Sequence, residues 1–112
     1  MVGSSQKPCR FDVFLVSLDP TQGAEIQKTR PGVILSPDEM NHALATVIVA
    51  PLTTVLRSYP TRISLVFRDK KGQIAVDQLR TLDQNRLLKK LGTVSQPTQK
   101  ELLDVLKALF CE

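Results

Sequence analysis

The chain has 112 residues, of which 42% are hydrophobic and 23% are charged, so it has room for one domain with one core and is too short for a multidomain enzyme. Lys and Arg number 15 against 11 Asp and Glu, and the resulting net charge of +4 permits a polyanionic partner without requiring one. Only 4% of the residues are aromatic, so a nucleic-acid surface of stacked rings would be sparse, and any such contact would rely on Arg and Lys.

Short apolar runs predict strands over the first two-thirds of the chain. Runs rich in β-branched and aromatic residues indicate strands at 11–18, 32–36, 46–52, 62–67 and 73–79. The polar stretch 19–31 is predicted to be a loop, and the polar stretch 37–45 is predicted to be a turn or a short helix. The stretch 69–72, with Asp first and Gly last, is typical of a hairpin turn.

Helices are predicted in the last third of the chain. A short helix capped by Asp83 is expected at 81–88. Ser95 or Thr98 is expected to cap a final helix, and Thr98 with Glu101 fits a capping box. Three- and four-residue spacing puts one apolar stripe on that helix, made of Leu102, Leu103, Leu106, Leu109 and Phe110. The helix therefore has to pack on the sheet or on a second subunit.

The cysteines and the first residues bear on metal binding and location. With a single histidine, His42, the two cysteines Cys9 and Cys111 cannot form a four-ligand zinc site, so we expect no metal and no cofactor. Two free thiols are expected, with a disulfide between the two chain ends as the alternative. Neither a signal-peptide pattern nor a run long enough to span a membrane is present, which predicts a cytoplasmic protein without membrane attachment. We expect one domain over 1–112, with 1–10 as a flexible extension.

Polar residues at strand ends are the candidates for a site, because a sheet fixes their positions while loops leave them accessible. Arg30 directly precedes Pro31, which favours an extended backbone, so its side chain should project from the start of the second strand. A lone Arg more often covers apolar surface or pairs with an acid such as Glu25. Likewise, Thr53 and Thr54 taken alone would only complete a strand end.

Basic residues also gather between the third and fifth predicted strands. Such a cluster is usually a solvated face, but here it could form a phosphate-attracting rim beside Thr53. Its members are Arg57, Arg62, Arg68, Lys70 and Lys71.

Taken in order, these segments resemble the MazF/PemK family of toxin endoribonucleases from bacterial toxin–antitoxin modules. The resemblance rests on SLDPTQGAEIQKTRPGVILSPDEMN, VIVAPLTT, YPTRI, DQLRTLD and RLLKKLG, and it covers nearly the whole chain from Asp12 onward. It implies a mainly β (α+β) fold, an SH3-like small β-barrel with a short helix and a C-terminal helix. It also implies a homodimer and metal-independent cleavage of single-stranded RNA, restrained by a cognate, MazE-like antitoxin with an acidic C-terminal tail.

The resemblance also assigns site residues. It places catalytic roles on Arg30, Thr53 and Glu25. It places RNA contacts on Gly23, Lys28, Thr29, Thr54, Arg57, Arg62, Asp77 and Gln78. The permanent charge and planar fork of Arg30 suit a phosphate clamp and not a base, whereas Thr53 can donate a hydrogen bond to a phosphate oxygen. Glu25 is either the base or the group that orients Arg30, because a neighbouring Arg would lower the pKa of its carboxyl.

Two positions depart from the family pattern. Phe11 stands where the family usually has Gly, and Ala75 stands where some PemK-like members have Arg. Three functions remain in view: an endoribonuclease, a non-catalytic toxin of the same fold that binds a protein such as DNA gyrase, and a degenerate member that only titrates antitoxin. Because a fold does not fix a function, the retained Arg30 and Thr53 are what favour the enzyme.

Overall fold

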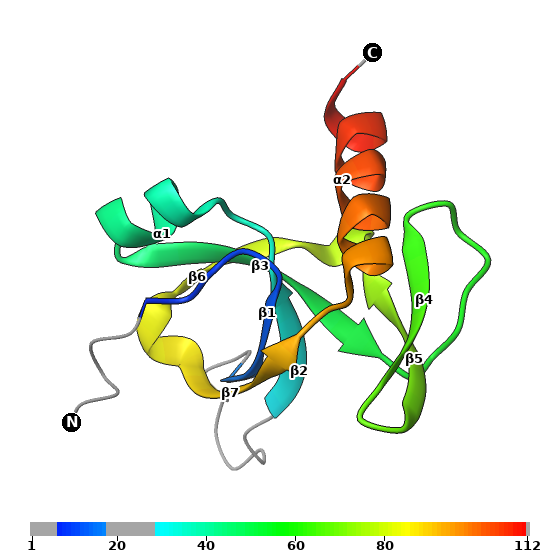
Figure 1. Cartoon of the computed structure of the whole chain (residues 1–112), viewed down its shortest axis with the longest axis horizontal. Coiled ribbons are helices and arrows are strands. Elements are labelled where there is room, and N and C mark those ends of the chain that lie inside the picture. The colour runs from blue at the N-terminus through cyan, green and yellow to red at the C-terminus, as the bar shows by residue number, and fades with distance from the viewer. Residues whose placement is uncertain (1–6, 18–28, 112) are drawn as a thin grey trace, which may run out of the picture.

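Seven antiparallel strands form one curled sheet in the part of the chain that the computed structural model describes, residues 7–17 and 29–111 (Figure 1). The strands are β1 (Asp12–Ser17), β2 (Thr29–Ile34), β3 (Thr46–Thr53), β4 (Arg62–Phe67), β5 (Lys70–Ala75), β6 (Arg80–Asp83) and β7 (Leu87–Thr93). Their order across the sheet is β4-β5-β3-β2-β1-β7, and β6 pairs with β3 beside this path. The helices are α1 (Asp38–Ala43) and α2 (Gln96–Phe110), with short 3-10 turns at η2 (Val76–Gln78) and η3 (Gln84–Arg86). The predicted mainly β fold with a short helix and a C-terminal helix is confirmed, and the predicted small barrel is a sheet curled into a half-barrel.

The apolar runs become strands because β2 and β3 bury both of their faces. Alternate residues of these strands enter two different core clusters, so that Val33 and Ala50 lie in one cluster while Ile34 and Val49 lie in the other. A strand buried on both faces has a continuous apolar sequence, which is what 32–36 and 46–52 show. Helix α2 covers the first of these clusters through the fully buried Leu102.

The prediction of a helix at 81–88 is wrong. Residues 80–83 form β6 on the edge of β3, a single 3-10 turn follows, and β7 begins at Leu87 and pairs with β1. The side chain of Asp83 does accept a hydrogen bond from the backbone N–H of Asn85, at 3.2 Å, but it caps only this short turn. Strand pairing satisfies the backbone of 87–93 over a longer stretch than a two-turn helix would, and tertiary contacts of this kind override local propensity.

The final helix differs from its prediction at its start and along its stripe. Ser95 is the N-cap residue, but its hydroxyl bonds to the hydroxyl of Thr98 at 3.1 Å and caps no backbone N–H. The expected capping box of Thr98 and Glu101 therefore lies inside the helix. The apolar stripe divides as well, because Leu102 is buried whereas Phe110, near the end that projects from the body in Figure 1, is 70% exposed.

Neither of the two helices in the described part of the chain is long and apolar enough to cross a membrane.

The hairpin between β4 and β5 has its two central turn residues at 68 and 69, whereas the predicted turn at 69–72 would place them at 70 and 71. Arg68 and Asp69 both have positive φ, 52° and 66°, as a two-residue turn of the I′ kind requires. Gly72 lies instead inside β5, where a Cβ atom would meet the carbonyl oxygen of Thr53 at 2.8 Å. The glycine thus serves the close approach of β5 to the end of β3 and takes no part in the turn.

The segment before β1 is bound to the body of the protein from Pro8 onward, although 1–10 was expected to be flexible. The amide of Asn41 donates to the carbonyl of Pro8 at 3.1 Å, and the guanidinium of Arg10 donates to the carbonyl of Leu35 at 2.7 Å. Phe11, at the family's Gly position, has a φ of 77°, a region that favours Gly, so this chain enters β1 with a strained backbone. Both Cys9 and Cys111 are exposed free thiols.

Candidate functional site

The pairing of β2 with β3 brings the two predicted catalytic residues in the described part of the chain to the same end of one strand pair. The antiparallel ladder between these strands runs from Ile34 with Val49 to Gly32 with Pro51, so the start of β2, with Arg30, and the end of β3, with Thr53, lie at the same end of the strand pair. Arg30 is exposed and Thr53 is half-buried, so both are accessible at this end of the sheet.

The hydroxyl of Thr53 has one of its oxygen lone pairs engaged by its own chain. Its Oγ1 accepts a hydrogen bond from the backbone N–H of Val55 at 3.0 Å, which holds the side chain at the strand end. A hydroxyl that accepts one bond still has its proton to donate. The hydroxyl proton of Thr53 is therefore available for a bond to a ligand.

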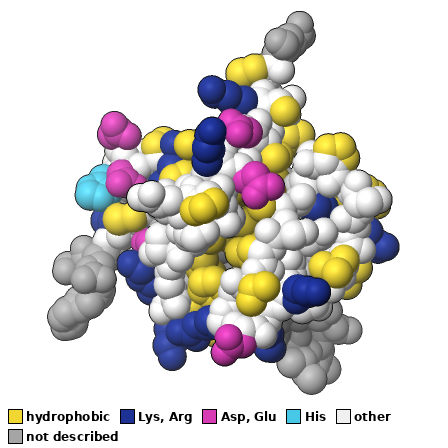
Figure 2. Space-filling view, turned by 45° about the vertical axis from the view of Figure 1, so that its right-hand side comes forward, with side chains coloured by type: hydrophobic (Ala, Val, Ile, Leu, Met, Phe, Trp, Pro, Cys, Tyr) yellow, Lys and Arg dark blue, Asp and Glu magenta, His cyan; other side chains and the backbone are white. Residues whose placement is uncertain are grey.

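A groove of about 380 Å³ opens beside Thr53. Its walls are apolar and come from four strands, and its rim is basic. The apolar wall residues are Pro31, Leu52, Leu65, Phe67 and Leu91. The basic rim residues are Arg68, Lys70 and Lys71, all exposed, and with Thr53 and Thr54 they give the groove a polar edge. Figure 2 shows that Lys and Arg side chains also gather along the lower margin of that face of the molecule.

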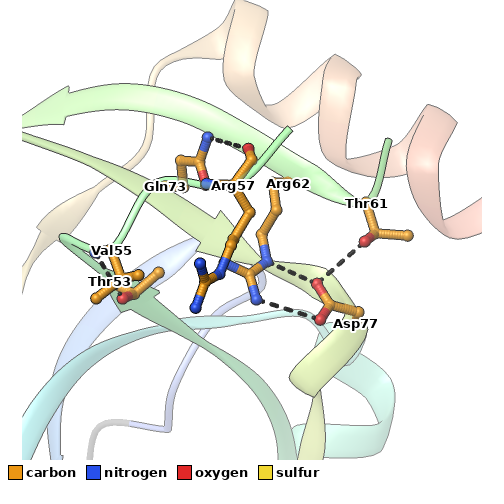
Figure 3. Close-up of polar contacts among 7 residues, drawn as sticks. All are labelled: Thr53, Val55, Arg57, Thr61, Arg62, Gln73 and Asp77. Carbon is orange, nitrogen blue, oxygen red and sulfur yellow. Dashed lines mark hydrogen bonds and ion pairs between the residues drawn. The ribbon is translucent and has the colours of Figure 1, made fainter. Parts of the chain in front are cut away.

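The segment 54–61, which connects β3 to β4, is held by a glutamine that the sequence analysis did not single out. Gln73 pairs with Thr53 in the β3–β5 ladder and is 6% exposed. Its side-chain Nε2 donates to the carbonyl of Arg57 at 2.9 Å, and its Oε1 accepts from the backbone N–H of Arg57 at 3.0 Å (Figure 3). The available signal was a Gln at the first position of the predicted strand 73–79, because an amide that a sheet buries requires partners.

An ion pair closes the other end of this segment. The Nε of Arg62 donates to Oδ1 of Asp77 at 2.8 Å, Nη2 lies 3.4 Å from Oδ2, and the hydroxyl of Thr61 donates to Oδ1 at 3.0 Å (Figure 3). The Arg62 side chain is only 6% exposed, and its guanidinium lies 5.2 Å from the centre of the Tyr59 ring. The hydrogen bond from Arg62 is the main cause that lowers the pKa of the Asp77 carboxyl, with a further contribution from Thr61.

This ion pair also explains how the chain accommodates Ala75, where some PemK-like members have Arg. Ala75 is fully buried, so its position has no room for a long charged side chain. Arg62 pairs with Ala75 in the β4–β5 ladder, and it is Arg62 that reaches Asp77. The neighbouring strand therefore supplies a guanidinium beside the carboxylate.

The predicted site residues have different positions in the structure. Arg30 with Thr29 at the start of β2, and Thr53 with Thr54 at the end of β3, flank one strand pair. Around them lie Arg57, exposed on the connecting segment, Arg62, and Asp77 and Gln78 on η2. The other three predicted residues, Gly23, Glu25 and Lys28, lie outside the described residues.

Asp77 makes the site sensitive to acid. Because the pKa of Asp77 is lower in the folded state than its ordinary value of about 3.9, its ion pair stabilises the fold fully above that value, and this stabilisation is lost as the pH falls through the folded pKa. We therefore expect the difference in Tm between the parent and Asp77→Asn to be constant from pH 7 to pH 5 and to shrink below about pH 4. Thermal unfolding followed by circular dichroism measures this, with Asp69→Asn as the control for the loss of one negative charge. A difference that does not change with pH would contradict it.

Comparison with known proteins identifies the family. A family model described as PemK-like, MazF-like toxin of type II toxin–antitoxin system matches residues 9–110. A protein named Endoribonuclease MazF from Staphylococcus saprophyticus is 39% identical over 99 residues, which cover 83% of this chain and 82% of the relative. A solved mycobacterial endoribonuclease in complex with its cognate antitoxin is 27% identical, with a TM-score of 0.76 over 90% of this chain and 92% of that chain. MazF of Deinococcus radiodurans, 23% identical, shares the fold with a TM-score of 0.79 over 96% of this chain and 100% of that one. The chain belongs to the PemK-like, MazF-like family of toxins of type II toxin–antitoxin systems, as its sequence predicts.

Proposed function

We propose that this toxin cleaves single-stranded RNA at short sequences, using Arg30 and Thr53 as its catalytic pair. Its class as an endoribonuclease rests on the 39% identity with Endoribonuclease MazF over most of both chains. The single observation that supports the proposal is that antiparallel pairing of β2 and β3 places Arg30 and Thr53 at the same end of the strand pair, where Thr53 lines a groove with a basic rim.

The proposed reaction is attack of a ribose 2′-OH on its own 3′ phosphate. The bond from O2′ to phosphorus forms, the bond from phosphorus to O5′ breaks, the 2′-OH proton passes to a base, and O5′ takes up a proton. The products are a 2′,3′-cyclic phosphate and a 5′-OH end. Arg30 stabilises the negative charge that builds on the phosphate, and Thr53 donates its free hydroxyl proton to a phosphate oxygen.

We assign the role of base to Glu25, following the family resemblance. Asp77 is poorly suited to it, because Arg62 and Thr61 occupy its oxygens and its lowered pKa makes it a weak base. All the groups that this mechanism requires are side chains, so we propose that it needs no metal ion.

Replacement of Arg30 tests the central assignment. Since Arg30 is exposed, Arg30→Ala should keep the Tm of the parent while lowering the cleavage rate by about 100- to 1000-fold, the typical effect of losing one electrostatic stabiliser of a transition state. A fluorogenic RNA assay in EDTA measures the rate. Lys107→Ala, which removes one exposed positive charge from α2, is the matched control and should cleave like the parent. A parental rate in Arg30→Ala would refute the role of Arg30, whereas a parent that cuts no RNA would favour a toxin that acts by binding a protein.

The chemistry of the step has its own test. An RNA with a 2′-deoxy or 2′-O-methyl nucleotide at the cleaved position should resist the enzyme, because its nucleophile is absent, while the unmodified RNA is cut in EDTA. Mass spectrometry of the products should find the cyclic phosphate and the 5′-OH. Cleavage of the modified RNA at the same bond would exclude 2′-OH attack, and loss of all cleavage in EDTA would exclude the metal-free mechanism.

We further propose that the toxin is a homodimer in the cytoplasm, where transcripts are found, and that an antitoxin with an acidic tail covers its RNA surface. The mycobacterial relative solved with its cognate antitoxin supports this partner. A net charge of +4 on each chain attracts RNA and an acidic tail alike, and the tail would order on binding. We expect a dimer mass by light scattering at micromolar concentration, and competition between antitoxin and RNA. A monomer with full activity, or an antitoxin complex that binds RNA undiminished, would contradict this arrangement.

A further inference from the structure

We propose that Gln73 is a positioning residue of the RNA-cleaving site, which fixes the segment 54–61 in the geometry that cleavage and sequence selection require. The inference rests on the proposed function, since it gives a role in RNA cleavage to a side chain that has none in the mechanism above. Gln73 itself is buried and need not touch RNA.

The first ground is the place of Gln73 in the sheet. It lies directly opposite Thr53 in the β3–β5 ladder, and Gly72 beside it allows the two backbones to approach closely. From this position its amide bonds both the N–H and the carbonyl of Arg57, at 3.0 and 2.9 Å. One side chain therefore does for Arg57 what the backbone of a neighbouring strand would do, and it ties the segment after Thr53 to the strand beside Thr53.

The second ground is the burial of the amide. Gln73 is 6% exposed, so its two bonds to Arg57 are shielded from water and are stronger than the same bonds would be on an open surface. These bonds favour one position of Arg57 over the alternatives. The exposed side chain of Arg57 therefore starts from a backbone position that is fixed relative to Thr53 (Figure 3).

The third ground is the contrast between a fixed backbone and exposed side chains. The segment is also held where Val55 bonds to Thr53 and where the N–H of Arg62 donates to the carbonyl of Tyr59 at 3.1 Å. Yet three of its large side chains are about half exposed, namely Val55 at 53%, Leu56 at 55% and Tyr59 at 51%. A rigid backbone that presents apolar and basic side chains next to a catalytic residue is suited to select a nucleotide sequence.

The chain contains a matched control for a test. Gln84 uses the same chemistry far from this site, because its Nε2 donates to the carbonyls of Asn41 and Leu44 at 2.8 and 3.0 Å. It lies beside the first residues of β3, whereas Gln73 lies beside the last. Gln84→Met therefore removes a comparable contact between a side chain and the backbone without disturbing the segment after Thr53.

The experiment compares Gln73→Met and Gln84→Met with the parent protein. Hydrogen exchange of the Arg57 amide, followed by NMR, should be slow in the parent and in Gln84→Met and fast in Gln73→Met. The kinetic assay uses an RNA oligonucleotide that carries the cleavage site mapped for the parent. At saturating RNA, Gln73→Met should lose about 10- to 100-fold in kcat, the scale expected from a small misplacement of catalytic groups. In a long transcript, it should cut a changed set of sites. Gln84→Met should stay within about twofold of the parent. If the Met variant does not fold, Gln73→Glu takes its place, because it keeps the acceptor for the Arg57 N–H. Its loss in kcat should then be smaller than the loss of about 10- to 100-fold expected of Gln73→Met.

Each outcome decides a separate point. The positioning role would be overturned if Gln73→Met exchanged the Arg57 amide fast and still had the kcat and cleavage sites of the parent. It would also be overturned if Gln73→Met and Gln84→Met lost equal amounts of kcat in proportion to their losses in Tm. Fast exchange in the parent would overturn the contact itself. A parent that does not cleave RNA would overturn the proposed function and the positioning role with it, while the exchange of Arg57 would still report whether Gln73 holds the segment.

Discussion

The pairing of β3 on both of its edges is the constraint on which the rest of the structure depends. β2 pairs with one edge of β3, while β6 and β5 pair with successive parts of the other edge. Since both of its faces are buried as well, β3 can neither twist nor slip in register without exposing one of the two core clusters. Thr53 is the last residue of β3, so its backbone is held in place by this pairing. Its side chain lies at the edge of a groove that a ligand can enter.

The basic residues near this strand end divide into two groups with different tasks. Arg62 is almost fully covered, and its charge is neutralised by Asp77, so it works within the protein by holding the start of β4 to η2. The exposed group is available to a polyanion. Arg57 lies on the segment before β4, and Arg68, Lys70 and Lys71 line the groove. The net charge alone could not separate these tasks, because an ion pair and a phosphate contact use the same side chains.

Side-chain amides hold the connections between strands in this small domain. Gln73 binds the segment after β3, Gln84 binds the end of α1, and the buried Asn41 binds the carbonyls of Pro8 and Ser36. Among the described residues, every buried side-chain nitrogen and oxygen has a hydrogen-bond partner. Buried amides of this kind are costly to leave unpaired, so they select a single loop geometry where apolar contacts would tolerate several.

The sequence by itself determined the strands of the core, the final helix and the family, and it singled out Arg30 and Thr53 beside two of these strands. The strands and the final helix follow from apolar runs and turn residues that act over a few neighbouring positions, whereas the family and the roles of Arg30 and Thr53 follow from the order of motifs that resembles the MazF/PemK family. The tertiary structure alone decided that 87–93 pairs with β1 as a strand, because the partner lies far away along the chain. It also decided that Arg62 binds Asp77, that Gln73 holds Arg57, and that Gly72 serves the approach to Thr53 and not the turn. Each of these depends on residues that are distant in sequence and meet only when the sheet closes, so no local pattern can reveal them.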